Sequence, residues 1–405
     1  MSRLRIALVT PNLPVPHDLT RGRYIHETAR ALSRIATVRV YFPQIRHPKM
    51  AGFAPRTFLG GLVGPDYALD GIDLEPYAYP GFPGLSRATN GLVGGRALLP
   101  RLRRYAPDIV LGYWVFPDGD AAVRAARAIG VPCIVGARGS DIHARKGLGA
   151  WLTRSTLRRA DAVLTVSQAM RRAAIDDFGV DPGKLTTIVN GIDTAVFHPR
   201  DRQAMRARLG IAPGVRLLTY VGRLVETKGL RELLEAFAVV RAARPDAELA
   251  LVGDGVMRAR LDAMVATAGL AGRVHMPGGM DHAGVAEWIG ASDLLTLPSW
   301  SEGYPNVLVE ALACGCAVVA TDVGGASEIV DASSGILVPP RAPAALAEAL
   351  DKALARSWDH AAISHAMSRS WDDVARETLS SCVAVLEARG RLSPARARGA
   401  PTASG

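Results

Sequence analysis

The stretch 293-DLLTLPSWSEGYPNVLVEALACGCAVVATD-322 contains a strand, a loop, a helix and a second strand in its residue pattern. The runs "LLTLPS" and "CAVVATD" are short, apolar and of a length typical of buried strands. Between them, Pro305 suits the first turn of a helix and Gly315 suits its end. A strand, a helix and a strand in this order predict a parallel sheet with a right-handed crossover.

The same alternation runs along most of the 405 residues. Apolar runs typical of buried strands alternate with amphipathic runs of helical length, in two series of about six strands each. Gly, Asp and Pro residues in "NGIDTAVFHPRD", residues 190–201, separate the two series. We therefore predict an α/β protein with two Rossmann-like, doubly wound domains, over residues 1–195 and 196–370.

The end of the chain departs from this alternation. Residues 371–388 have the pattern of a helix with no strand after it. We predict that this helix crosses back to the first domain. Residues 389–405 are rich in Pro, Ala, Arg and Gly, and this composition predicts a disordered tail.

Composition places the chain among ordinary globular proteins, with 49% hydrophobic and 21% charged residues. No apolar run reaches the roughly 18 residues of a membrane span, and the first residues lack the apolar core of a signal peptide. We therefore expect a cytoplasmic protein. The four cysteines have no metal-ligand spacing, so buried thiols in a reducing compartment are expected.

The charge is uneven along the chain. Residues 1–200 hold 27 basic and 15 acidic residues, whereas residues 201–405 hold 21 and 23. The basic first half suits an anionic partner such as a membrane surface or a lipid diphosphate. The alternative is a basic bias that serves only solubility. No motif that reads nucleic acid is present, so nucleic acid is not an expected partner.

Polar residues follow two predicted strands of the second domain, at the strand ends where open parallel sheets bind ligands. The segment "YVGRLVETKG" places Arg223 and Lys228 between a strand and a helix, where two cations suit a diphosphate. The segment "LVGDG" places Gly253 at another strand end. Because Arg258 stands where the third glycine of a dinucleotide fingerprint would be, NAD is not an expected ligand.

Two glutamates flank the start of the predicted helix in the opening stretch. Glu302 precedes the helix and Glu310 lies inside it. A carboxylate can accept two hydrogen bonds from a vicinal diol, so Glu302 suits sugar hydroxyls and Glu310 suits a ribose. The alternative is that Glu302 caps the helix and Glu310 points into solvent. Glu310, however, lies within the apolar run "VLVEALA", where a lone buried carboxylate would be costly. Backbone N–H groups in the first turn of a helix have no helical partner and suit phosphate. This turn comprises Gly303, Tyr304, Pro305, Asn306 and Val307, of which only the proline lacks an N–H group.

Taken together, these motifs resemble the family 4 glycosyltransferases, which share the two-domain glycosyltransferase-B fold with a central cleft. The resemblance runs from residue 4 to about 388. It rests on "NGID", "VGRLVETKG", "GDG", "VHMPG" and residues 298–325, in this order. The segment "GVPCIVGARGSDIH" further resembles the branch that makes bacterial surface polysaccharides and teichuronic-type polymers.

The resemblance implies a retaining hexosyltransferase that moves a sugar from a UDP- or GDP-sugar to a lipid-linked or polysaccharide acceptor. The first domain would bind the acceptor and the second the donor, with no metal or other cofactor. We expect a cytoplasmic monomer or weak homodimer, whose basic first half suits contact with the inner face of the cytoplasmic membrane.

The same resemblance implies roles for the residues named above. Arg223 and Lys228 would hold the donor diphosphate, Glu302 the transferred sugar and Glu310 the ribose. Further donor contacts would come from Gly22 in the first domain and from Gly253, His275, Met276 and residues 303–307 in the second.

One segment departs from the family pattern. Much of the family has His-Gly-Ser-Asp where this chain has Arg138-Gly139-Ser140-Asp141. Because arginine cannot shuttle a proton, Arg138 is expected to stabilise the departing diphosphate or to orient Asp141. Arg138, Asp141 and Glu302 are therefore the candidate catalytic residues. Two other functions stay open, namely a sugar-nucleotide epimerase of the same architecture and a non-catalytic sugar-nucleotide-binding subunit.

The chain has one D-x-D segment, Asp118-Gly119-Asp120, which follows Pro117 and precedes a predicted helix. Paired acids at this spacing can bind a metal, but a helix cap is the favoured interpretation of their position.

Overall fold

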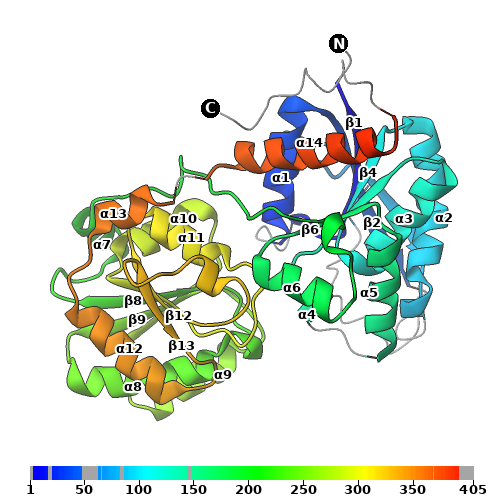
Figure 1. The fold of residues 1–405 in the computed structure, drawn as a ribbon. Helices are drawn as coiled ribbons and strands as arrows, with labels where there is room; N and C mark the ends of the chain where they lie inside the picture. The colour runs from blue at the N-terminus through cyan, green and yellow to red at the C-terminus, as the bar shows by residue number, and fades with distance from the viewer. Residues whose placement is uncertain are drawn as a thin grey trace. The chain divides into compact units, whose positions relative to one another are not determined.

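The computed structural model describes residues 3–16, 21–47, 63–64, 66–82, 86–143, 147–367 and 369–391. The chain divides into two compact units, the first made of residues 1–191 with 371–405 and the second of residues 192–370 (Figure 1). Most of the tail predicted over 389–405 lies outside the described residues. No described helix has both the length and the apolar character needed to cross a membrane.

The first unit contains a seven-stranded parallel sheet in the order β3-β2-β1-β4-β5-β6-β7. In the central register, Leu8 of β1 lies opposite Val40 of β2 and Leu111 of β4, and all three side chains are fully buried. The strands are β1 (Arg5–Val9), β2 (Thr37–Arg46), β3 (Asp73–Pro80), β4 (Ile109–Tyr113), β5 (Cys133–Gly136), β6 (Ala162–Thr165) and β7 (Leu185–Thr187).

Helices cover both faces of this sheet, with α1 packed on α14 and α2 packed on α3 (Figure 1). Their bounds are α1 (Arg23–Ile35), α2 (Asn90–Tyr105), α3 (Asp120–Ala128), α4 (Ser140–His143), α5 (Gly147–Arg159), α6 (Gln168–Asp176) and α14 (Trp371–Ala388). The last helix buries Val374, Leu379 and Cys382 in the same core as β1 and α1. It therefore belongs to the first unit, although it follows the second in sequence.

The second unit repeats the architecture with a six-stranded parallel sheet in the order β10-β9-β8-β11-β12-β13. Its strands are β8 (Arg216–Val221), β9 (Ala247–Val252), β10 (Val274–Gly278), β11 (Leu294–Leu297), β12 (Ala317–Thr321) and β13 (Gly335–Val338). Its helices are α7 (Arg202–Leu209), α8 (Leu230–Ala243), α9 (Arg258–Thr267), α10 (His282–Ala291), α11 (Asn306–Ala313), α12 (Pro343–Ala355) and α13 (His360–His365).

The predicted α/β class with two doubly wound parallel sheets is confirmed. The strand count was wrong for the first series, where β3 was not predicted. This strand contains Pro76 and ends at Pro80, and proline within a run argues against a central strand. Because β3 lies at the edge of the described sheet, where it pairs with β2 on one side, it tolerates a residue without an N–H donor.

The two acids of the D-x-D segment have different environments, and neither caps α3 with its side chain. Gly119 occupies the N-cap position, and Asp120 is the first residue of the helix. Asp120 pairs with Arg124 at 2.7 Å and also with Arg159. Asp118 is 5% exposed, and burial raises the pKa of its carboxyl to about 7, although the charge of Arg21 opposes this shift.

The substitution Asp118→Asn is expected to raise the free energy of unfolding at pH 8 and to change it little at pH 4. The folded chain keeps the Asp118 carboxyl protonated up to about pH 7, whereas the unfolded chain releases this proton near the usual pKa of 3.8. Wild-type stability therefore falls as pH rises between these values, by about 4 kcal/mol at most, and the neutral amide avoids that decrease.

Urea unfolding at the two pH values measures this effect. Asp70→Asn, at an exposed carboxyl of the same unit, is the matched control. An equal change at both pH values for Asp118→Asn would contradict the assignment of a protonated, buried carboxyl.

Candidate functional site

The second sheet reverses its strand order between β8 and β11. The chain passes from β8 outward to β9 and β10, and then crosses back to add β11, β12 and β13 on the other side. In open parallel sheets, ligands bind at such a switch point, beyond the carboxyl ends of the strands. The loops that follow β8 and β11 therefore frame the candidate site.

Backbone contacts hold these two loops together. Gly229 has a φ of 65°, and a Cβ at this position would lie 2.0 Å from the carbonyl oxygen of Pro298. The N–H of Trp300 donates to the carbonyl oxygen of Thr227 at 2.9 Å. The Trp300 ring N–H also donates to Glu232 of α8 at 3.1 Å. Only glycine fits at position 229, and its close approach fixes where Lys228 and the loop after β11 lie.

Lys228 and Glu302 meet at this switch point. The Lys228 ammonium donates to the Glu302 carboxylate, and the two side chains are 18% and 13% exposed. Each charge is thus largely removed from water and balanced by the other. Glu302 also influences buried Tyr220, because burial first and this negative charge second raise the pKa of the Tyr220 hydroxyl.

Arg223 differs from Lys228 because no described acid pairs with its side chain. Its side chain is exposed, and among the described residues it makes no ion pair or hydrogen bond. Its carbonyl oxygen accepts a 2.9 Å hydrogen bond from the Tyr220 hydroxyl, which fixes the backbone at the end of β8. The position therefore supplies an unneutralised guanidinium on an anchored backbone.

Glycine also shapes the adjacent strand end. At Gly253 a Cβ would lie 1.9 Å from the carbonyl oxygen of Gly222, so the ends of β8 and β9 approach more closely than side chains permit. Asp254 accepts a 2.6 Å hydrogen bond from the N–H of Gly279. The Asp254 carboxylate therefore holds the turn after β9 to the turn after β10.

The helix α11 begins one residue later than predicted, with Pro305 at the N-cap position instead of within the first turn. The loop before it is tied to the loop after β12, because the N–H of Gly325 donates to the carbonyl oxygen of Gly303 at 3.1 Å. Burial raises the pKa of the Tyr304 hydroxyl to about 12. Glu310 lies in the second turn and is partly buried, so it is neither a lone core carboxylate nor fully solvated.

Most of the predicted donor-binding residues follow carboxyl ends of strands in this unit. The group comprises Arg223, Lys228, Gly253, Glu302, Gly303, Tyr304, Pro305, Asn306, Val307 and Glu310. His275 and Met276 lie apart from it, within the edge strand β10. His275 Nε2 is 2.7 Å from a carboxylate oxygen of Glu248, and Met276 packs against the core. The His275 side chain is therefore engaged by Glu248, and the Met276 side chain lies partly against the core.

The first sheet has its own switch point, between β1 and β4. Gly22 lies there as the N-cap of α1, with a φ of 59°. A Cβ at this position would lie 2.2 Å from the carbonyl oxygen of Asn12, so glycine is required where the start of α1 approaches Asn12.

Asp141 acts on the backbone around it. Its fully buried carboxylate accepts hydrogen bonds from the N–H groups of Gly139 at 2.7 Å, Arg138 at 3.0 Å and Val115 at 3.2 Å. Burial raises the pKa of this carboxyl, and the three donors oppose the rise. Because Val115 follows β4 and Arg138 follows β5, the Asp141 carboxylate joins two strand ends.

Arg138 is held by residues that the sequence did not indicate. Its guanidinium carbon lies 4.1 Å from the ring centroid of Tyr113 and 5.7 Å from that of Tyr24. Its Nη1 donates to the amide oxygen of Asn190 at 3.0 Å. Tyr113 and Asn190 are distant from Arg138 in sequence. Their contacts with Arg138 depend on the pairing of β4 with β5 and on the position of the loop after β7.

Two histidines of the first unit, His26 and His143, are candidates to replace the histidine absent at position 138. His26 Nε2 lies 2.9 Å from the carbonyl oxygen of Asp70, and the residue is buried. This contact gives His26 a structural role. The side chain of His143, the other candidate, lies outside the described part of the chain.

Comparison with protein families gives two adjacent matches. Residues 22–196 match the family described as Glycosyltransferase Family 4, and residues 201–369 match the family described as Glycosyl transferases group 1. The boundary between the two matches lies close to the division between the compact units.

Among related proteins is the putative teichuronic acid biosynthesis glycosyltransferase TuaC of Bacillus subtilis. It is 30% identical over 350 residues, which cover 83% of this chain and 86% of TuaC. Sucrose-phosphate synthase of Thermosynechococcus elongatus has a similar fold, with a TM-score of 0.76 at 20% identity over 95% of this chain and 100% of that one. Anabaena HepE in complex with UDP-glucose gives a TM-score of 0.67 at 20% identity over 96% and 100%.

These structural neighbours identify the two parallel Rossmann-like sheets as a glycosyltransferase-B fold. The family matches and the extent of the similarity to TuaC identify the kind of enzyme. The chain belongs to the family 4 glycosyltransferases, enzymes that take the transferred sugar from a nucleotide-sugar donor.

Proposed function

We propose that this enzyme is a retaining hexosyltransferase that moves a sugar from a UDP- or GDP-sugar to a lipid-linked or polysaccharide acceptor of a bacterial cell-surface glycan. The observation that carries the proposal is the Lys228–Glu302 pair at the switch point of the second sheet. It supplies a cation for a diphosphate and a carboxylate for sugar hydroxyls side by side.

Donor binding would exchange the partners of this pair. A diphosphate oxygen competes with Glu302 for the Lys228 ammonium, since both are anions that accept charge-assisted hydrogen bonds. The released Glu302 carboxylate can then accept hydrogen bonds from vicinal hydroxyls of the transferred sugar. Arg223 adds a second cation, and the first N–H groups of α11 add partial positive charge beside it.

Transfer develops negative charge on the departing diphosphate and positive charge on the sugar ring. Lys228, Arg223 and the amides at the start of α11 would stabilise the departing diphosphate, the contribution expected to lower the barrier most. The bond from the anomeric carbon to the diphosphate oxygen breaks, and a bond to the acceptor oxygen forms on the same face. The acceptor proton passes to a phosphate oxygen of the leaving group, so no side-chain base is needed.

Within this scheme Arg138 is a fixed cation of the first unit and Asp141 a residue that positions it. The Tyr113 ring and the Asn190 amide orient the guanidinium, and Asp141 holds the backbone on either side of it. A guanidinium in place of histidine cannot exchange protons at neutral pH, but it can stabilise phosphate. The proton route through the leaving group is consistent with this replacement.

Two comparisons support the finer parts of the proposal. The similarity to TuaC, whose name refers to teichuronic acid biosynthesis, favours a cell-surface polymer as the product. HepE, of similar fold, was solved with UDP-glucose, which favours a UDP-sugar as the first donor to test. The basic excess of residues 1–200 suits work at the inner face of the cytoplasmic membrane, next to anionic lipid.

A nucleoside diphosphate is expected to raise the melting temperature of the purified protein without added magnesium. The cations and amides described above hold phosphate directly, and a ligand at 100 times its dissociation constant adds about 2.7 kcal/mol to the free energy of unfolding. Differential scanning fluorimetry with UDP, GDP, ADP, CMP, NAD, UDP-sugars and GDP-sugars, each with and without magnesium, makes the measurement. Stabilisation by NAD alone, or by none of these compounds, would overturn the donor-site assignment.

Opposite changes in nucleotide affinity are expected for the two members of the central pair. Lys228→Ala should weaken binding of the stabilising nucleoside diphosphate about 10- to 100-fold, because the variant cannot form the charge-assisted hydrogen bond from the ammonium. Glu302→Gln should strengthen binding of the same diphosphate, because the carboxylate that competes for Lys228 is removed.

Calorimetric titration of each variant measures these affinities. Lys352→Ala, at an exposed lysine of α12 that also pairs with a glutamate, is the matched control and should bind as the wild type does. Weaker diphosphate binding in Glu302→Gln, with the fold intact, would contradict the exchange of partners.

A further inference from the structure

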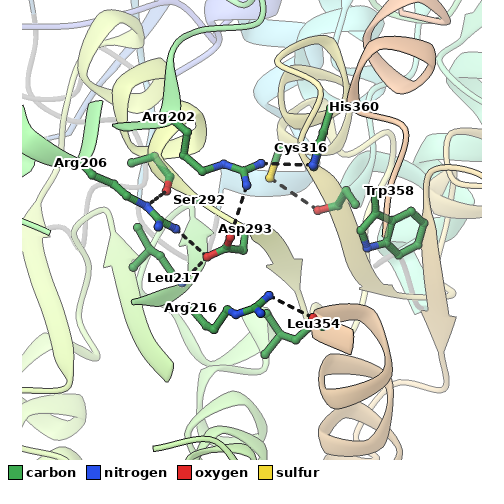
Figure 2. A network of polar contacts seen from close by, with 12 residues as sticks. Arg202, Arg206, Arg216, Leu217, Ser292, Asp293, Cys316, Leu354, Trp358 and His360 are labelled. Carbon is green, nitrogen blue, oxygen red and sulfur yellow. Dashed lines mark hydrogen bonds and ion pairs between the residues drawn. The ribbon is translucent and has the colours of Figure 1, made fainter. Parts of the chain in front are cut away.

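A cavity of about 250 Å³ opens at the end of the second unit opposite to the candidate donor site. It lies where β8 and β11 begin and where α12 ends, whereas the donor residues follow the carboxyl ends of the same strands. Its lining includes Arg202, Arg216, Asp293, Arg356, Trp358 and His360, most of which Figure 2 shows together. We call it the basic cavity.

Asp293 is the one acid among the described residues that line the basic cavity, and its charge is already balanced. Its carboxylate accepts hydrogen bonds from Arg206 Nη2 and from the N–H of Leu217, both at 2.7 Å (Figure 2). The Arg206 side chain is 4% exposed and also donates to two backbone carbonyls. The buried Arg206–Asp293 pair is therefore a neutral wall of the cavity.

The remaining cations have weak counter-charges. Arg202 Nη1 lies 3.4 Å from Asp293, which Arg206 has already neutralised. Arg216 Nε lies 3.7 Å from Asp246, but both side chains are about half exposed, and such a pair contributes little. The Arg356 guanidinium lies 4.1 Å from the centroid of the Trp358 ring. Three guanidiniums thus line one small hollow with little negative charge to balance them.

His360 and an adjoining hollow extend this surface. His360 Nδ1 lies 2.7 Å from the carbonyl oxygen of Gly315, which only accepts, so Nδ1 donates and Nε2 accepts from Arg202 at 3.4 Å. The adjoining hollow, about 200 Å³, shares Arg202 and His360 and adds Arg200. Arg200 Nε is buried and has no hydrogen-bond partner among the described residues. The same guanidinium donates through Nη2 to the carbonyl oxygen of Val196 at 2.9 Å, so Arg200 is anchored to the backbone and adds a cation to the wall of this hollow.

We propose that the basic cavity binds a phosphate-bearing anion at a second site, separate from the donor site. Arginine forks match phosphate oxygens in pairs, and three of them around one hollow suit a di-anion or a diphosphate. The volume is below the roughly 300 Å³ at which pockets begin to hold drug-sized molecules, so it suits a phosphate or diphosphate group and not a whole nucleotide sugar.

Pyrophosphate titration of the full chain tests the second site. The variant Lys228→Ala first weakens phosphate binding at the donor site, where Arg223 and the α11 amides remain, so that a loss of binding at the basic cavity is measured above a smaller donor-site contribution. In this background, Arg216→Gln with Arg356→Gln should weaken pyrophosphate binding about 100-fold, or about tenfold for each guanidinium removed. Both arginines are exposed, so their replacement leaves the Arg206–Asp293 wall intact.

The matched control is Arg231→Gln with Arg258→Gln, which removes two partly exposed arginines from α8 and α9, outside the basic cavity. It should bind pyrophosphate as its Lys228→Ala parent does. Two outcomes would overturn the proposal: no pyrophosphate binding in the Lys228→Ala background, or equal binding before and after Arg216 and Arg356 are replaced. Failure of the donor site gives a different result, since Lys228→Ala would then bind nucleoside diphosphate as the wild type does.

Vesicles identify the source of the anion. Co-sedimentation with phosphatidylglycerol vesicles that disappears when Arg216 and Arg356 are replaced would assign the site to a lipid headgroup. Pyrophosphate binding with no difference between these vesicles and phosphatidylcholine vesicles would assign it to a free anion.

Discussion

The close approach of two backbone segments at the switch point of the second sheet determines the geometry of the candidate donor site. All strands of this sheet are parallel, so the loops after β8 and β11 leave the same edge. Gly229 lets one loop rest directly on the Pro298 carbonyl of the other, and a side chain there would separate them. Lys228 precedes that glycine and Glu302 follows that proline by four residues, so the contact brings opposite charges together.

The parallel topology of the sheets also explains which features could be predicted from the sequence and which could not. The strand-helix alternation and the residues after strand ends are local features, and they predicted the fold and the group from Arg223 to Glu310. The pairing of Lys228 with Glu302 depends on β11 lying beside β8 in the sheet, which the order of the strands along the sequence does not provide. The same limit applies to Arg138, whose partners Tyr113 and Asn190 come from a neighbouring strand and a distant loop. β3 was missed because its prolines are tolerated only at a sheet edge.

The basic cavity could not be predicted from the sequence, for a related reason. Its residues come from α7, the starts of β8 and β11, and the segment between α12 and α13, and each is an ordinary charged residue in its own segment. The tendency of open parallel sheets to bind ligands at the carboxyl ends of their strands gives no reason to expect a site at the amino ends. Only the assembled sheet shows that several cations share one hollow there.

Burial separates the charged residues of this unit into those that hold the fold and those that can meet a ligand. Arg206 is almost fully buried and holds Asp293 at 2.7 Å, and its removal would leave Asp293 only the longer pair with Arg202 as a counter-charge, so Arg206 is structural. Arg216 and Arg223 are exposed. In the described part of the chain the Arg223 side chain has no partner, and Arg216 has an exposed 3.7 Å pair with Asp246 and a 3.3 Å hydrogen bond to the Leu354 carbonyl, so a ligand can engage both at little cost in stability. Lys228 and Glu302 lie between these limits. They are buried enough for the pair to persist without ligand and exposed enough for a diphosphate to reach it, which is the balance that an exchange of partners requires.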